Sequence, residues 1–285
     1  MKNRDFIITS LQPWDIEIGS TIKNTALEIS KNNRVLYINT PMDYSTRLRG
    51  NKNKAWTRRM DVIKKQASPI RQINEHMWIA DCPFCVLPVG GLPTTCLFDW
   101  INRINNRKIA DYIRQITAQL NFNNYIHLID TDIYRSQYLK EYLTPSLSIY
   151  YCRDFVIGES YWKKNGVRLE PLLAAKSDIV LANSTHFAER FRQYNRHTFS
   201  IETGVNLALY DGRKKWLIPE DIKPIPHPII GYVGTVNSTR LDSDLLLQIA
   251  EERPVYSFVF TGPEDEVFSQ HPIHRLPNVY FLGKK

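Results

Sequence analysis

The sequence predicts an α/β protein of two domains, each built on a parallel sheet. Short apolar runs alternate with helix-like segments along the chain, which is the pattern of strands joined by crossover helices. Its 285 residues suffice for about two domains of the usual size. Prolines at 219, 224, 226 and 228 mark a stiff, extended linker. We therefore expect a first domain at residues 1–211, a linker at 212–228 and a second domain at 229–285.

The beginning of the chain forms a β-α-β unit. Apolar runs predict strands at 6–9 and 34–39, with a helix at about 19–31 between them. Gly19 is an isolated glycine, and Asn39 rather than an acid ends the second strand. The unit therefore lacks the fingerprint of a dinucleotide-binding dehydrogenase.

The remaining elements follow the same alternation. In the first domain we expect strands at 77–80, 125–129, 146–151 and 178–182, and helices at 97–120, at 169–175 and after Ser184. His127 lies inside an apolar strand, so we expect it to be packed in the core. In the second domain we expect strands at 229–233, 256–260 and 279–282, with one helix at about 240–252. This is about half of a usual domain, so we expect the second domain to be incomplete.

The composition is that of a globular protein, with 43% hydrophobic and 23% charged residues. No apolar run approaches the ~18 residues of a membrane span, and the N-terminus leads directly into a strand rather than a signal peptide. We expect a soluble, cytoplasmic protein of a reducing compartment. Cys82 and Cys85 have redox-motif spacing, but a loop rather than a helix follows them, and a zinc site would need two further ligands. We expect no redox cofactor and no metal.

A basic segment lies between residues 47 and 65, with Asp61 as its acid and Trp56 in its middle. It contains Arg47, Arg49, Lys52, Lys54, Arg58, Arg59, Lys64 and Lys65. One interpretation is a solvated loop. The others are an exposed patch for anionic lipid head groups or for a phosphate-bearing acceptor. Nucleic acid is disfavoured, because the rest of the chain is near charge balance and carries no nucleic-acid motif.

Two stretches place polar groups at strand ends. Residues 229–240 run from an apolar strand through Gly234 into helix-like sequence, with Ser238 or Asp242 as the N-cap. Such a turn can present backbone N–H groups and a helix N-terminus to a phosphate. Arg153 and Asp154 follow the strand at 146–151, where parallel α/β folds place their chemistry, although a surface ion pair is the alternative.

Five motifs together resemble the GT-B glycosyltransferases of the family-4 type. They occur in that family's order and spacing at residues 178–184, 202–206, 228–236, 258–263 and 278–283. Pro13-Trp14-Asp15, Gly19-Ser20 and the strand at 35–38 resemble the branch that builds bacterial cell-surface polysaccharides. The resemblance covers nearly the whole chain.

The resemblance implies two Rossmann-like domains, the second of which binds a nucleotide-sugar donor. Its donor-binding positions match Gly19, Ser20, Gly234, Thr235, Gly262 and Lys284. Arg240 or Lys284 would stabilise the departing diphosphate, and Asp154 matches an acid that faces the acceptor. The expected reaction is transfer from a UDP- or GDP-sugar to a polysaccharide or lipid-linked acceptor with retention of configuration, without a metal, at the inner face of the plasma membrane.

Two other functions remain open at this point. A sugar-nucleotide epimerase shares the architecture but needs acid and base residues in its cleft, where Asp154 is the visible candidate. Alternatively, the chain is a non-catalytic fragment that binds acceptor or membrane. The family's paired glutamates beyond the third donor-domain strand have no counterpart in the sequence, so we expect a partial donor pocket and weak nucleotide-sugar binding.

Overall fold

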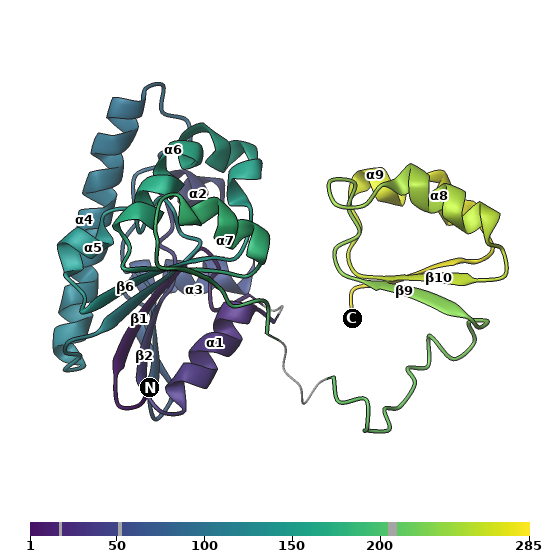
Figure 1. Cartoon of the computed structure of the whole chain (residues 1–285), viewed down its shortest axis with the longest axis horizontal. Helices are drawn as coiled ribbons and strands as arrows, with labels where there is room; N and C mark the ends of the chain where they lie inside the picture. Colours follow the sequence, from purple (N-terminus) through teal and green to yellow (C-terminus); the bar gives the residue numbers. More distant parts are fainter. Residues whose placement is uncertain (17–18, 51–52, 205–209) are drawn as a thin grey trace. The chain divides into compact units, whose positions relative to one another are not determined.

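The computed structural model describes residues 1–16, 19–50, 53–204 and 210–285. The chain divides into two compact units, unit 1 at Met1–Tyr210 and unit 2 at Asp211–Lys285. Each unit contains its own sheet (Figure 1). The prediction of an α/β protein is confirmed, with a mainly parallel sheet in unit 1 and a parallel sheet in unit 2.

The strands described in unit 1 form one eight-stranded sheet in the order β3-β4-β2-β1-β5-β6-β7-β8. Their bounds are β1 (Asp5–Ser10), β2 (Arg34–Ile38), β3 (Ile70–Asn74), β4 (Met77–Ala80), β5 (Ile126–Asp130), β6 (Leu147–Cys152), β7 (Ile179–Ala182) and β8 (Thr198–Ser200). The β3–β4 pair is antiparallel, whereas the other pairs are parallel. The chain order reverses between β1 and β5, which makes the carboxyl ends of these two strands the topological switch point of the sheet.

Helices pack on both faces of this sheet. They are α1 (Thr21–Ser30), α2 (Tyr44–Arg49), α3 (Lys54–Ile63), α4 (Thr95–Gln119), α5 (Leu139–Leu143), α6 (Ser160–Lys176) and α7 (Thr185–Arg192), with a 3-10 turn η1 (Val156–Gly158). Alternate residues of β1 divide the core: Ile8 packs with Ile22 of α1, and Ile7 packs with Ile113 of α4. Figure 1 accordingly shows α1 and α4 on opposite sides of the sheet. His127 of β5 is fully buried, as predicted.

Two segments differ from the sequence analysis. The interpretation of residues 47–65 as a solvated loop is wrong, because α2 and α3 cover most of the segment. Asp43 caps α2 by accepting a hydrogen bond from Thr46 N (2.7 Å), and Asn53 caps α3 by accepting one from Trp56 N (2.8 Å). Helix α6 begins nine residues before the expected 169 and contains Pro171 in its interior.

Unit 2 has a parallel sheet in the order β11-β10-β9, and all its residues are described. Its elements are β9 (Ile229–Val233), α8 (Ser243–Glu252), β10 (Ser257–Thr261), α9 (Glu266–Ser269), η2 (Pro272–Arg275) and β11 (Val279–Gly283). Helices α8 and α9 lie on one side of the sheet (Figure 1). They cover a core centred on Phe258, Phe260 and Phe268.

The turns after β9 and β10 approach so closely that one of them requires glycine. A Cβ atom on Gly262 would lie 1.7 Å from the carbonyl oxygen of Gly234, and Gly262 has φ +149°. Backbone atoms cannot move aside as a side chain can. The two strand ends can therefore approach this closely only because residue 262 has no side chain.

We predict that Gly262→Ala destabilises unit 2 by about 2–4 kcal/mol, because both the clash and the backbone conformation oppose a side chain. Gly231→Ala is the matched control, since a Cβ there meets no atom within 4 Å. Hydrogen exchange of the β10 amides measures the effect. Equal protection in the two variants would contradict this account of the turn.

The cysteines provide a second test of the packing. Cys82 and Cys85 are buried, and burial raises the pKa of Cys82 to about 12. Burial likewise raises the pKa of the buried Cys152, whereas Cys96 is exposed. We expect iodoacetamide at about pH 8 to modify Cys96 in the folded chain, and all four cysteines only after unfolding. Rapid modification of Cys82 or Cys85 would instead indicate a reactive thiol pair.

Candidate functional site

A polar cluster lies at the switch point of unit 1. Asp130, at the end of β5, accepts hydrogen bonds from Arg153 Nε (2.9 Å) and Nη2 (3.2 Å). Ser10, at the end of β1, donates its hydroxyl to the same carboxylate (2.6 Å). Burial raises the pKa of Asp130, although the bonds from Arg153 and Ser10 oppose that rise. Residues at the ends of three strands that are distant in sequence thus form one hydrogen-bonded cluster. The cluster lies at the edge where open α/β sheets bind ligands.

Arg153 is fixed through both its backbone and its side chain. Its N–H donates to Thr131 Oγ1 (3.1 Å), its carbonyl accepts from Asn183 Nδ2 (2.6 Å), and Nη2 also donates to Gln12 Oε1 (3.1 Å). Burial alone would lower the pKa of Arg153, but the hydrogen bonds and charge of Asp130 raise it overall. The permanently charged guanidinium therefore has one position.

Asp154, the predicted catalytic residue, lies beside this anchored arginine. Its Oδ2 atom is 3.5 Å from Arg153 Nη1, and 60% of its side chain is exposed. The exposed carboxylate can meet a ligand, whereas Asp130 is fully buried. The alternative of a surface ion pair describes the Arg153–Asp154 contact correctly, but it omits the buried half of the cluster.

The residue between Asp130, the last residue of β5, and Asp132 has a strained backbone. Thr131 has φ +56°, which is rare for a β-branched residue, and it is completely buried. A hydrogen bond from its N–H to Tyr151 O (3.0 Å) holds this conformation. Strain of this kind persists where the surrounding structure imposes it, and it lies here between the two buried carboxylates of Asp130 and Asp132.

A second chain of hydrogen bonds leads from Asp132 into the core. Ser136 Oγ lies 3.4 Å from Asp132 Oδ2 and 2.8 Å from Thr9 Oγ1, which in turn lies 2.9 Å from His127 Nε2. Burial lowers the pKa of His127 to about 3, so the imidazole is neutral. These hydrogen bonds connect Asp132 to the core beneath the switch point, and the neutral His127 adds no charge there.

Sequence analysis missed Asp130, Thr131 and Asp132. The signal was present, since an Asp-Thr-Asp run directly follows the predicted strand at 125–129. The Arg153–Asp154 pair was noticed because its two charges are adjacent in sequence. Asp130 pairs with Arg153 across 23 positions, a distance that no local pattern reveals.

Part of the predicted basic patch points inward at the ends of β2 and β4. Arg58 pairs with the buried Asp81 (3.2 Å), and Asp81 accepts a further bond from Asn39 Nδ2 (2.7 Å). Within the described residues, Arg59 Nε and Nη2 are buried without a hydrogen-bond partner, and burial lowers the pKa of Arg59. The expectation of an exposed patch is therefore wrong for Arg58, which pairs with a buried carboxylate, and for Arg59, whose Nε and Nη2 atoms are buried.

The rest of the basic segment keeps its charge at the surface. The exposed members are Arg47, Arg49, Lys54, Lys64 and Lys65. Lys52 lies outside the described residues.

Of the predicted diphosphate loop, Gly19 and Ser20 precede α1. Ser20 is the N-cap of this helix and accepts a hydrogen bond from Lys23 N (3.3 Å). A Cβ on Gly19 would meet no atom within 4 Å, so its backbone borders open space.

The predicted donor residues of unit 2 gather at the carboxyl ends of its strands. Gly234 N donates to Thr261 O, and Gly262 N donates to Gly283 O, each at 2.9 Å. These bonds align the three strand ends that carry Gly234, Gly262 and Lys284. Thr235 and Arg240 are exposed in the segment that follows β9.

Helix α8 does not present its N-terminus to a phosphate in the expected way. It begins at Ser243, well after the glycine turn, and Asp242 caps it by accepting from Leu245 N (3.0 Å). Asp244 adds a second carboxylate in the first turn, so acids of the chain itself face the helix dipole. Ser238 instead donates its hydroxyl to Asp265 (2.8 Å). Any anion at this edge would depend on the glycine turns and the basic side chains.

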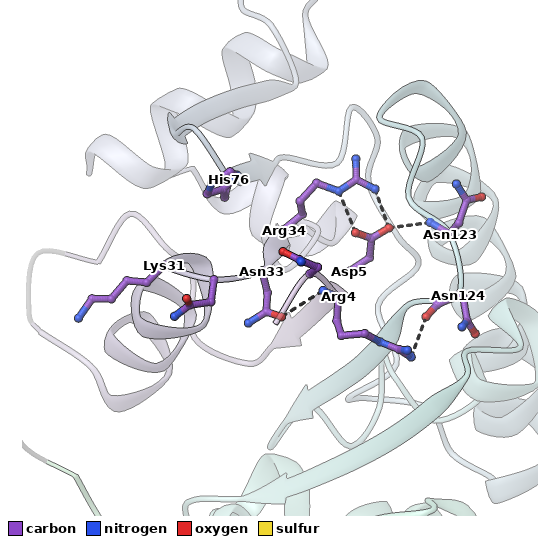
Figure 2. A pocket seen from close by; sticks show the side chains of 10 residues that line it. Arg4, Asp5, Lys31, Asn33, Arg34, His76, Asn123 and Asn124 are labelled. Atoms are coloured by element: carbon purple, nitrogen blue, oxygen red, sulfur yellow. Dashed lines mark hydrogen bonds and ion pairs between the residues drawn. The ribbon is translucent and has the colours of Figure 1, made fainter. Parts of the chain in front are cut away.

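A hollow of about 660 Å³ lies at the opposite, amino edge of the sheet in unit 1 (Figure 2). Asp5 accepts bonds from Arg34 Nε (2.8 Å) and Nη2 (2.7 Å) and from Asn123 N (2.7 Å), while Arg4 N donates to Asn33 Oδ1 (3.1 Å). Figure 2 shows these groups paired with one another. These polar groups at the border of the hollow therefore hold neighbouring segments of the fold together.

None of the helices seen in the structure is long and apolar enough to cross a membrane. Nor do the described His, Cys, Asp and Glu side chains form a group of three that could hold a metal ion.

Comparisons with solved structures identify the fold. HepE from Anabaena, solved with UDP and glucose, is 14% identical with a TM-score of 0.56, over 99% of this chain and 70% of that chain. Sucrose-phosphate synthase from Thermosynechococcus elongatus is 11% identical with a TM-score of 0.59, over 99% and 71% of the two chains. A UDP-glucosyltransferase from Polygonum tinctorium is 10% identical with a TM-score of 0.54, again over 99% and 71%.

No protein-family model and no curated protein sequence matches the chain. Identities this low establish the fold alone. The chain has the GT-B fold of two Rossmann-like units, a fold that it shares with these glycosyltransferases.

Proposed function

We propose that this chain is a family-4-type glycosyltransferase that transfers a sugar, with retention, from a UDP- or GDP-sugar to a cell-surface polysaccharide or a lipid-linked acceptor. The observation that supports it most is the combination of a GT-B fold over 99% of the chain with a preorganised charged cluster at the switch point of unit 1. Sugar transfer needs an acceptor-orienting acid and stabilisation of a leaving diphosphate, and the two units offer one each.

Unit 2 is the proposed donor-binding unit. A nucleoside diphosphate leaving the sugar accumulates negative charge, which N–H groups and cations can stabilise in the transition state. Gly234 and Gly262 belong to the turns that are proposed to face the diphosphate, and Thr235, Arg240 and Lys284 are proposed to add polar and cationic side chains there. Gly19 and Ser20 of unit 1 are proposed to contact the diphosphate as well. No metal is required in this scheme.

Unit 1 is the proposed acceptor-binding unit, with Asp154 as its catalytic residue. The exposed carboxylate would accept a hydrogen bond from the acceptor hydroxyl and orient it toward the donor sugar. Arg153 Nη1 lies 3.5 Å from Asp154 Oδ2, and Asp130 holds Arg153 in turn. The exposed basic residues between 47 and 65 are proposed to attract an anionic acceptor or the anionic inner face of the membrane.

Asp154→Asn should lower the rate of UDP release from UDP-glucose, or of GDP release from GDP-mannose, by about 100-fold, because it removes the orienting negative charge. Glu141→Gln is the matched control, since Glu141 is also a half-exposed acid paired with a cation, Lys176 at 2.9 Å. Saturation-transfer NMR should show both variants contacting the donor as the unmodified chain does, and it detects weak binding. Absence of contact with either donor would contradict the proposed function.

A further inference from the structure

We propose that Phe155 is a stacking platform on which unit 1 holds a sugar ring of its acceptor, beside the carboxylate of Asp154. Both residues follow the carboxyl end of β6, at the edge where open α/β sheets bind ligands. The aromatic ring would cover the apolar C–H face of the sugar, while the carboxylate accepts hydrogen bonds from hydroxyl groups at its rim. The assignment of this sugar to the acceptor rests on the proposed function, whereas the stacking site itself does not.

Phe155 is exposed although the two residues after it belong to the core. It is 54% exposed, whereas Val156 and Ile157 in η1 are each 9% exposed and pack in one cluster with the buried Ile133. Gly158 N donates to Phe155 O (3.0 Å), which closes the turn. The core thus fixes the backbone of Phe155 and leaves its ring at the surface.

Three neighbouring residues limit the positions of the Phe155 ring. A Cβ atom on Gly158 would lie 3.1 Å from Phe155 Cδ1, so the ring rests against this glycine. On α7, the Phe187 ring is nearly parallel to it, at 10° with 6.1 Å between centroids, and Arg190 Cζ lies 5.5 Å from the Phe155 centroid. Single exposed apolar residues are ordinary. A ring that its neighbours already hold is preorganised for a ligand, because little freedom is lost on binding.

Arg190 is itself fixed by a buried acid. Its Nη2 atom donates to Glu170 Oε2 (2.7 Å), and Glu170 Oε1 accepts from the hydroxyl of Tyr150 (2.7 Å). Glu170 is 1% exposed and Tyr150 is fully buried, so these bonds connect the arginine to the core. Like Arg153, Arg190 is thus paired with a buried carboxylate. Its guanidinium attracts the electron-rich face of an aromatic ring, which favours its position beside Phe155.

The chemistry around Phe155 favours a sugar over a lipid surface or a phosphate. Asp154 and Glu159 are exposed before and after it in the chain, and exposed carboxylates repel anionic groups. A pyranose ring is uncharged, with C–H groups on its faces and hydroxyl groups at its rim. Ligand sites are typically lined by aromatic side chains with a few polar groups that fix orientation. Phe155 matches the face of such a ring, and Asp154 matches its rim.

Saturation-transfer NMR of the full chain with methyl β-D-glucopyranoside and methyl β-D-galactopyranoside tests the inference. We expect the protons on one face of the sugar to receive more saturation than those on the other, because one face lies on the aromatic ring. Phe155→Leu keeps an apolar side chain but removes the ring, so it should weaken binding of the glycosides by about threefold to tenfold. Phe155→Tyr keeps the ring and should bind them like the unmodified chain.

The matched control is Phe199→Leu, which makes the same change at another exposed phenylalanine of unit 1 (52% exposed). It should leave glycoside binding unchanged. Absence of glycoside contact with the unmodified chain would overturn the proposal, and so would equal binding by the two leucine variants. If Phe155→Leu instead weakens contact with UDP-glucose or GDP-mannose, the ring belongs to a donor site and the proposal is also overturned.

Donor and glycoside contacts are measured in separate samples, so two different failures can be told apart. Glycoside contact without donor contact would contradict the proposed function and leave the stacking platform in place. Donor contact without glycoside contact would overturn the platform alone. A solution dimer that Phe155→Leu converts to monomer would assign the exposed ring to self-association instead.

Discussion

The buried ion pair between Asp130 and Arg153 is the interaction on which the carboxyl edge of unit 1 depends. It joins β5 to β6 beside the switch point, and Ser10 attaches β1 to the same carboxylate. Removing one partner of a buried pair typically costs about 3–5 kcal/mol, since the other charge is left unpaired. The strained Thr131 and the amide of Asn183 constrain the same arginine. Asp154 lies beside the arginine that these contacts hold.

The two edges of the sheet in unit 1 contrast in how their polar groups are used. At the amino edge the hollow is large, but Arg34 donates hydrogen bonds to Asp5 and to the carbonyl oxygens of Leu120 and Asn121. At the carboxyl edge, the buried Asp130 holds Arg153, and Asp154 beside this arginine remains exposed. A site that binds ligands needs this second arrangement, because groups that satisfy one another have little left to offer. The size of a hollow is therefore a poorer guide here than the direction of its charges.

The fold was predictable because a buried strand is a continuous apolar run that can be recognised in the local sequence. The apolar runs at 6–9, 34–39 and 125–129 are strands since the centre of a parallel sheet is covered on both faces. The candidate site was predictable only where charges are adjacent, as at Arg153 and Asp154. Its partner Asp130 depends on strand order, which local patterns do not specify.

The basic segment and the second unit show the same limit. The positive charge between residues 47 and 65 was evident from composition. Which side of α3 faces the interior was not, and Arg58 lies on that side, where it pairs with Asp81. The glycine turn at Gly234 was expected to place a helix N-terminus beside it. Instead, α8 begins at Ser243, and Asp242 and Asp244 lie at its N-terminus. Acidic residues at a helix start cap its N–H groups and offset its dipole, as a bound phosphate would.

The central claim is that ligands meet this protein at the carboxyl edges of its sheets. Hydrogen-exchange mass spectrometry of the full chain, with and without UDP-glucose or GDP-mannose, tests it most directly. We expect slower exchange at 234–240 and 261–265 in unit 2 and at the start of α1 in unit 1, with no change at 3–5, 31–34 and 123–124 around the amino-edge hollow. Protection around that hollow, with none at the strand ends, would contradict the account.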